Sequence, residues 1–296
     1  MEVLRTPEER FDGLPGLRYE SRFRRWGELR LAHLDEGNGP PVVMLHGQPT
    51  WSYLFRRVME PLLDAGYRCI APDLPGFGRS DKPLDIGWYS YDRHVTAVAA
   101  LLEDLDLRDV TLLVHDWGGP IGLRVATAPR SDRVTRLVAM DTLVLTGEQE
   151  LGDSWRWFRD LVASRDDLPV GRIVRMGCRR RPSPEVAAAY DAPFPNSASK
   201  AGVRAFPRLV PLSPEDPAAV AGREIVDALR DDDRPALLLW AESDPIFPRE
   251  DFAGGLRALI PRAGEVITVE AAGHFLPEDR GEHIGATVAA WLDEEG

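Results

Sequence analysis

The residues best able to do chemistry form a short run, HDWGG (residues 115–119), which follows the apolar segment 110–114. A helical pattern continues over residues 120–128, so the run occupies a strand–turn–helix connection, the setting of a nucleophile elbow. Such elbows usually read G-x-S-x-G, and here Asp116 stands where the serine would be. A carboxylate attacks amides poorly, but it displaces a leaving group from saturated carbon and forms an alkyl ester. The run therefore predicts substitution at saturated carbon.

Asp116 also has a purely structural interpretation, because aspartate is a good N-cap for the helix that follows. That interpretation does not explain the two glycines that come next, Gly118 and Gly119. Consecutive glycines allow the backbone to approach its neighbours closely, as a sharp elbow requires. The nucleophile interpretation accounts for both features.

A second loop with chemical potential is HGQPTW (46–51), which follows the apolar strand candidate 41–45. In a hydrolase elbow, this loop and the residue after the nucleophile each donate a backbone N–H to an oxyanion hole. The expected donors are Gln48 and Trp117. The same sequence also fits a tight turn with a buried histidine.

An acid and a histidine follow the last two strand candidates, 236–240 and 265–270. Asp244 can orient a histidine, although an aspartate before proline is also a common turn residue and Glu242 competes for the role. Of the six histidines, His274 alone combines a strand-end loop, a neighbouring glycine and a late position. The order Asp116, Asp244, His274 is that of α/β-hydrolase triads.

The elements that must position these loops alternate between strands and helices, which predicts a mostly parallel sheet flanked by helices. The expectation is an α/β-hydrolase fold with eight strands. Strand candidates cover residues 18–23, 28–34, 41–45, 67–71, 110–114, 134–140, 236–240 and 265–270, the first two as a hairpin. Helix candidates cover residues 57–65, 91–105, 120–128 and 283–292, and residues 73–83 are expected to form a loop.

The alternation breaks between residues 142 and 233, a stretch rich in proline with helical pieces and no clear strand. We expect this stretch to be a helical cap inserted after the sixth strand, above the carboxyl ends of the strands. Residues 1–141 and 234–296 then form the α/β core. Active sites in such sheets form at the carboxyl ends of the strands, beneath such a cap.

Composition narrows the class of partner. A net charge of −12 and a pI near 5.1 argue against nucleic acid and anionic membranes. No stretch approaches the roughly 18 apolar residues of a membrane helix. Cys69 and Cys178 lack metal-ligand spacing, which favours a reduced compartment. We therefore expect a cytoplasmic protein, a monomer, without metal or cofactor.

The chain resembles the haloalkane dehalogenases over nearly its whole length. HDWGG alone is shared with epoxide hydrolases, so the specific likeness comes from HGQPTWSYL together with the cap segment. The matching segments are HGQPTWSYLFR (46–56), DLPGFGRSDKP (73–83), HDWGGPIGLR (115–124), DAPFPNSASKAGVRAFP (191–207), SDPIF (243–247) and AGHFLPED (272–279).

This resemblance implies a halogenated alkane, water and halide as substrate, co-substrate and product. It makes Asp116 the nucleophile that forms an alkyl-enzyme ester, His274 the base that activates water, and Asp244 its orienting acid. It implies that the backbone N–H groups of Gln48 and Trp117 bind the oxyanion. Gln48 is a glutamate in some relatives; its neutral amide can hold the hydrolytic water but adds no negative charge.

The resemblance also makes the indole N–H of Trp117 a halide donor. An indole offers one donor and no acceptor, so it suits an anion in a dry pocket. The chain is similar to the subfamily whose second donor is a cap tryptophan. Counting back from the following segments favours Trp157, with Trp155 as the alternative, and packing in a cap helix is the structural interpretation of both.

Three other functions compete. An epoxide hydrolase shares the triad but usually needs two cap tyrosines, and residues 142–233 contain only Tyr190. Phe194 and Phe206 are expected to supply apolar walls instead. An intact triad argues against a non-catalytic ligand receptor with this fold, and the absence of an elbow serine argues against a serine esterase.

Overall fold

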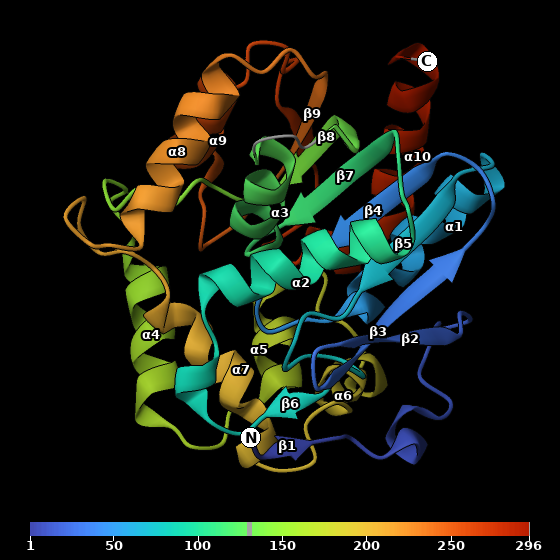
Figure 1. Cartoon of the computed structure of the whole chain (residues 1–296), viewed down its shortest axis with the longest axis vertical. Coiled ribbons are helices and arrows are strands. Elements are labelled where there is room, and N and C mark those ends of the chain that lie inside the picture. Colours follow the sequence, from blue (N-terminus) through green and yellow to red (C-terminus); the bar gives the residue numbers. More distant parts are fainter. Residues whose placement is uncertain (129–131, 296) are drawn as a thin grey trace.

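The computed structural model describes residues 1–128 and 132–295, and its centre is an eight-stranded sheet in the order β10-β9-β8-β7-β4-β5-β3-β2 (Figure 1). Its strands are β2 (Ser21–Trp26), β3 (Leu29–Glu36), β4 (Pro41–Leu45), β5 (Arg68–Pro72), β7 (Val110–His115), β8 (Val134–Met140), β9 (Ala236–Ala241) and β10 (Ile267–Val269). The β2–β3 and β3–β5 pairs are antiparallel, and the other five pairs are parallel. The predicted α/β-hydrolase fold is confirmed.

Helices cover both faces of this sheet (Figure 1). They are α1 (Arg56–Asp64), α2 (Tyr91–Asp104), α3 (Gly118–Thr127), α4 (Asp153–Ser164), α5 (Val170–Gly177), α6 (Pro184–Asp191), α7 (Ala201–Ala205), α8 (Ala219–Arg230), α9 (Arg249–Leu259) and α10 (Leu276–Glu295). On one face α1 packs along α10, and on the other α2 and α8 pack against α3. The central strands β4, β7 and β9 are almost wholly buried between these layers, as expected for parallel strands with both faces covered.

The segment between β8 and β9 carries α4 to α8, and within the described part of the chain it contains no strand. Figure 1 shows α4 to α7 gathered beyond the carboxyl ends of the central strands. Local signals start α6: Ser183 accepts a hydrogen bond from the Val186 N–H, and Pro184 occupies the first turn. Helix α8 differs from the others, because it packs on α3 and α9 of the sheet layer.

A buried ion pair ties this helical segment to the core. Arg56 on α1 donates two hydrogen bonds to the carboxylate of Glu278 on α10, at 2.7 and 2.8 Å. The hydroxyl of Tyr190 on α6 donates to the same carboxylate at 2.6 Å. All three side chains are buried, so the charges of the pair are compensated by hydrogen bonds rather than by water. We call this group the Arg56–Glu278–Tyr190 clamp.

Several sequence predictions differ from the observed elements. The loop predicted for residues 73–83 ends in a two-residue strand, β6 (Lys82–Pro83), which pairs antiparallel with β1 (Val3–Leu4). Helix α9 was not predicted. The last helix begins at Leu276, not at residue 283, and is kinked at Arg280, where the backbone leaves helical geometry.

Two general properties follow from the described residues. None of the helices within residues 1–128 and 132–295 is both long and apolar enough to cross a membrane. Cys69 and Cys178 are both buried free thiols.

Candidate active site

The elbow after β7 holds Asp116 in a strained conformation. Its φ is +50°, the left-handed region that costs a non-glycine residue roughly 1–2 kcal/mol. The hydroxyl of Thr142 donates to the Asp116 carbonyl at 2.7 Å and helps to hold this turn. A Cβ on Gly118 would lie 2.1 Å from the Leu45 carbonyl oxygen, and one on Gly119 would lie 1.8 Å from Thr142 Oγ1. The two glycines are therefore needed for the close approach of the elbow to its neighbours.

The loops after β9 and β10 bring an acid and a histidine to this elbow. His274 Nδ1 lies 2.8 Å from Asp244 Oδ2, and His274 Nε2 lies 3.6 Å from Asp116 Oδ2. Asp244 Oδ1 accepts the backbone N–H of Ile246 at 2.7 Å, which fixes the orientation of the carboxylate. Glu242, the competing acid, instead accepts the Ala271 N–H on the exposed side of the loop. The structure thus brings together Asp116, Asp244 and His274.

Electrostatics in this group favour a charged imidazole while both carboxylates are ionised. Burial lowers the pKa of His274, but the charges of Asp244 and Asp116 outweigh burial and raise it well above the ordinary value of 6.5. Burial raises the pKa of Asp244, but its hydrogen bond to His274 and the charge of that ring bring it below 3.8. Removing the charge of Asp116 would therefore lower the pKa of His274 and favour its neutral ring, which is the form that can accept a proton.

Two other buried histidines support the site without entering it. Burial lowers the pKa of His46 and of His115 to about 4, so both rings are neutral at pH 7. His115 Nε2 lies 2.7 Å from the His274 carbonyl oxygen, and His46 Nε2 accepts the Leu74 N–H at 3.1 Å. Through these contacts the two rings fix the loop that carries His274 and the loop that follows β5.

The loop after β4 places Gln48 against Asp116. The Gln48 backbone N–H donates to Asp116 Oδ1 at 2.7 Å, whereas the structure gives Trp117 N–H no such bond. A Cβ on Gly47 would lie 2.0 Å from Asp116 Oδ1, so only glycine permits this approach. The Gln48 side chain donates across to the Val203 carbonyl on α7 at 2.5 Å.

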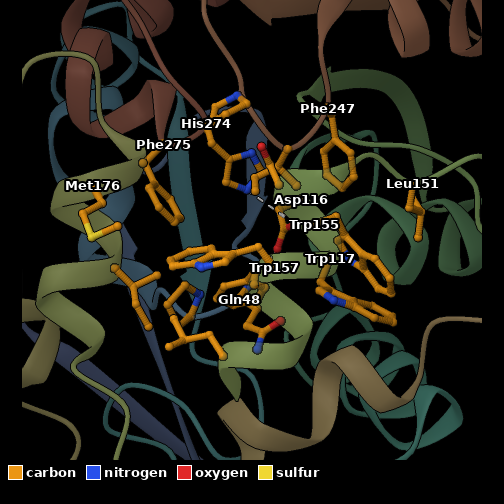
Figure 2. Close-up of a pocket in the computed structure, with 18 of the residues that line it drawn as sticks. Gln48, Asp116, Trp117, Leu151, Trp155, Trp157, Met176, Phe247, His274 and Phe275 are labelled. Atoms are coloured by element: carbon orange, nitrogen blue, oxygen red, sulfur yellow. Dashed lines mark hydrogen bonds and ion pairs between the residues drawn. The ribbon is translucent and has the colours of Figure 1, made fainter. Parts of the chain in front are cut away.

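A cavity of about 570 Å³ opens above Asp116, and its walls are mainly apolar. Figure 2 shows Asp116 between His274 on one side and three tryptophans on the other. Trp117, Trp155 and Trp157 all line the cavity. No described residue accepts a hydrogen bond from the indole N–H of Trp117, so this donor is open to a ligand.

The two tryptophans of α4 have different surroundings. Trp155 is 7% exposed, belongs to the hydrophobic core and has the Arg159 guanidinium 5.4 Å from its ring centroid. Trp157 is 55% exposed although it lines the cavity, and it stands outside the core. A large exposed side chain beside a cavity is harder to explain by packing than a buried one.

Some residues at the site were missed or misplaced from the sequence. Thr142 and Asp141, at the end of β8, were not singled out, although their position at a strand end was the available signal. Phe194 and Phe206 do not line the cavity; Phe206 is fully buried and packs behind Trp117, with ring centroids 4.7 Å apart.

One cluster has metal-ligand chemistry. Ligand atoms of Asp141, Asp244 and His274 lie within 4.8 Å of one another. His274 Nδ1 already contacts Asp244, so this cluster belongs to the triad.

Known proteins resemble this chain over its full length. A family profile described as the alpha/beta hydrolase fold matches residues 40–280. A haloalkane dehalogenase of Mycolicibacterium paratuberculosis is 45% identical, over 98% of each chain. The chain belongs to the haloalkane dehalogenase family. Another haloalkane dehalogenase, from Psychrobacter cryohalolentis, is 39% identical over 99% of each chain. The solved haloalkane dehalogenase DpaA of Paraglaciecola agarilytica, described as tetrameric, has a TM-score of 0.90 at 33% identity, covering 97% of each chain.

Proposed function

We propose that this haloalkane dehalogenase converts haloalkanes and water to an alcohol, a halide and a proton through a covalent ester on Asp116. The observation that carries the proposal is that the two oxygens of that carboxylate have different surroundings. One oxygen is held by the Gln48 N–H at 2.7 Å, and the other faces His274 at the floor of an apolar cavity. Covalent catalysis uses this arrangement, in which a base lies close to the nucleophile and an acid orients the base.

In the first step, Asp116 Oδ2 attacks the carbon that bears the halogen. A carbon–oxygen bond forms while the carbon–halogen bond breaks, and the halide leaves with the bonding electrons. The apolar walls leave the carboxylate with little solvent, which strengthens its interaction with the reacting carbon. Oδ1 stays on the Gln48 N–H and becomes the carbonyl oxygen of the ester.

In the second step, the ester carbonyl carbon is attacked by water that His274 Nε2 deprotonates. Alkylation has neutralised Asp116, which removes one of the two charges that raise the pKa of His274. The ring therefore releases its resting proton to solvent and can then accept one from water. Gln48 N–H, with Trp117 N–H, stabilises the oxyanion. The tetrahedral intermediate formed by this attack then collapses, which releases the alcohol and restores the Asp116 carboxylate. Each turnover releases one proton in total.

The departing halide needs neutral donors, because a fixed positive charge in the cavity would itself have to be desolvated. We assign this role to the indole N–H groups of Trp117 and Trp157. The cavity position of Trp157 outside the core supports it over Trp155, which the core already uses for packing. This assignment places the chain in the subfamily with a cap tryptophan as second donor.

The epoxide hydrolase alternative is weakened by Tyr190. Opening an epoxide requires acids that reach the oxygen in the cavity. Tyr190 is fully buried, does not line the cavity and donates to Glu278 in the clamp. The chain therefore has no cap tyrosine placed for that chemistry between residues 142 and 233.

The remaining assignments are proposals about organisation. We assign residues 142–233 to the cap and residues 1–141 and 234–296 to the core, with α8 the part of that cap range that packs on the sheet layer. We further propose a cytoplasmic location, which the buried free thiols of Cys69 and Cys178 support, and a monomeric state. Size-exclusion chromatography with light scattering tests the monomer.

The experiment that tests the function is halide release from chlorinated, brominated and iodinated alkanes of several lengths, beside a panel of epoxides. We expect release from bromoalkanes and no epoxide opening. Asp116→Asn should abolish release, since an amide is not a nucleophile. Asp153→Asn, an exposed acid that also lines the cavity, is the matched control. Equal halide release by the wild type and Asp116→Asn would refute the mechanism.

A further inference from the structure

A second buried carboxyl group, on Asp141, stands beside the triad and has no role in the steps above. Strand β8 lies between β7 and β9, and Asp141 follows its last residue. Met140 pairs with His115, so Asp141 and Asp116 occupy equivalent positions at the ends of neighbouring strands. Both have left-handed backbones, with φ of +37° and +50°. Strain of this kind persists where the surrounding structure enforces it, often at functional sites.

The surroundings of Asp141 leave one oxygen without a partner. The residue is fully buried, and Oδ1 accepts the Ala241 N–H at 2.9 Å. Oδ2 is buried and has no hydrogen-bond partner among the described residues. An unpartnered buried carboxylate oxygen is costly, whereas a protonated carboxyl group offers an O–H that needs an acceptor.

The available acceptor is Asp244. Ligand atoms of Asp141, Asp244 and His274 lie within 4.8 Å of one another. Asp244 uses one oxygen for His274 and the other for the Ile246 N–H, but each carboxylate oxygen can accept a second bond. Two ionised carboxylates at this distance in a dry site would repel each other strongly.

The charged groups that face Asp141 favour its neutral form. Asp244 follows β9 and His274 follows β10, while the neutral ring of His115 ends β7 and Asp116 comes directly after it. Burial and the charge of Asp244 raise the pKa of Asp141 well above 3.8, and the opposing effect of His274 is smaller.

We propose that Asp141 is a positioning residue that stays protonated and donates its O–H to Asp244, so that the two carboxyl groups share one proton beside His274. The role rests on the proposed function, because it acts on the reaction through Asp244 and His274. The donated bond orients Asp244 and limits its negative charge. A limited charge keeps His274 from holding its proton too tightly once the ester has formed.

Two substitutions separate a hydrogen-bond donor from mere packing. Asp141→Asn keeps an acceptor for Ala241 and a donor for Asp244, so kcat should stay within about threefold of wild type. Asp141→Leu has a similar shape but no donor, and kcat should fall by about tenfold or more with little change in KM, as when a buried bond to a charged group is lost. Loss of kcat in Asp141→Asn equal to that in Asp141→Leu would overturn the proposal, and so would wild-type activity in Asp141→Leu.

A measurement without turnover tests the proton itself. The folded state binds the Asp141 proton more tightly than the unfolded state, so wild-type stability should fall as pH rises from about 4 towards the folded pKa. The amide of Asp141→Asn does not titrate. Denaturant unfolding should therefore show that the free energy of unfolding of this variant rises relative to that of wild type across this pH range. Parallel pH profiles would overturn the proposal. Should wild type release no halide, the proposed function fails, and the unfolding profiles alone decide whether Asp141 is protonated.

Discussion

His274 Nε2 lies 3.6 Å from Asp116 Oδ2, slightly longer than a hydrogen bond, while the opposite ring nitrogen is bound to Asp244 at 2.8 Å. The bond between Nδ1 and Asp244 thus fixes the orientation of the ring, whereas Nε2 is not hydrogen-bonded to Asp116. Its free nitrogen faces the atom that forms the ester, which suits a base that acts on water after alkylation and not on the carboxylate itself.

Replacing His274 should separate the two chemical steps. In His274→Phe, Asp116 can still attack but no base activates water, so the alkyl ester should accumulate. We expect each enzyme molecule to release about one halide ion in an initial burst and then to stop turning over. Intact-protein mass spectrometry after exposure to 1-bromohexane should show one added hexyl group, located on Asp116 by peptide mapping. Continued turnover at the wild-type rate would exclude His274 as the base.

Substitutions of the two tryptophans of α4 should have different effects on halide affinity. Trp157→Phe removes an N–H from the cavity but keeps an aromatic ring, so bromide affinity should fall by about tenfold or more, the effect of one lost hydrogen bond to an ion. Trp155→Phe is the matched control and should change bromide affinity little. Quenching of the intrinsic fluorescence by bromide measures both. The reverse ranking would move the second donor to Trp155.

Tyr190 should affect stability and not chemistry. Tyr190→Phe removes a buried hydrogen bond to the charged Glu278, so the free energy of unfolding should fall by about 1.5–3 kcal/mol. Tyr53→Phe, which loses a bond to the neutral Pro15 carbonyl, should cost about 1 kcal/mol. Halide release at 25 °C should be unchanged in Tyr190→Phe. A specific loss of activity in the folded variant would restore a catalytic role for this tyrosine.

The triad should also leave a signature in stability against pH. The pKa of His274 is raised on folding, so its stabilising proton is fully present below about pH 6.5 and is lost as pH rises through the folded value. Asp244, whose pKa is lowered, contributes only above about pH 4. The deficit in unfolding free energy of Asp244→Asn should therefore be largest between about pH 4 and 6.5. His283→Gln, on the exposed side of α10, is the control.

Local signals explain why much of the fold could be predicted from sequence. Strand β8 coincides with the predicted residues 134–140. The predicted hairpin also forms, although β2 begins three residues later than predicted and includes Trp26, which was expected in the turn. The early start of α10 was missed because Pro277 and Gly281 normally mark loops. The β1–β6 pair was missed because two-residue strands have no periodicity to detect.

Site residues could likewise be predicted only where the signal lies in neighbouring residues of the sequence. Asp116 could be predicted because its strand, turn and glycines are neighbours in sequence. Asp141 could not, because it resembles any acid after a strand until β7 and β9 are placed on either side of it. The surroundings of Trp155 and Trp157 depend on how α4 packs over the cavity, which helical spacing alone does not determine.

The Arg56–Glu278–Tyr190 clamp has a consequence for how molecules reach Asp116. It anchors α6 to the core through a buried charge, whereas α4 and α5 present Trp157 and Met176 to solvent, both more than half exposed. Widening of the cavity should therefore pivot about α6 and occur at the α4–α5 edge. We expect the bulk of side chains along that edge, more than the triad, to set the largest substrate that the enzyme admits.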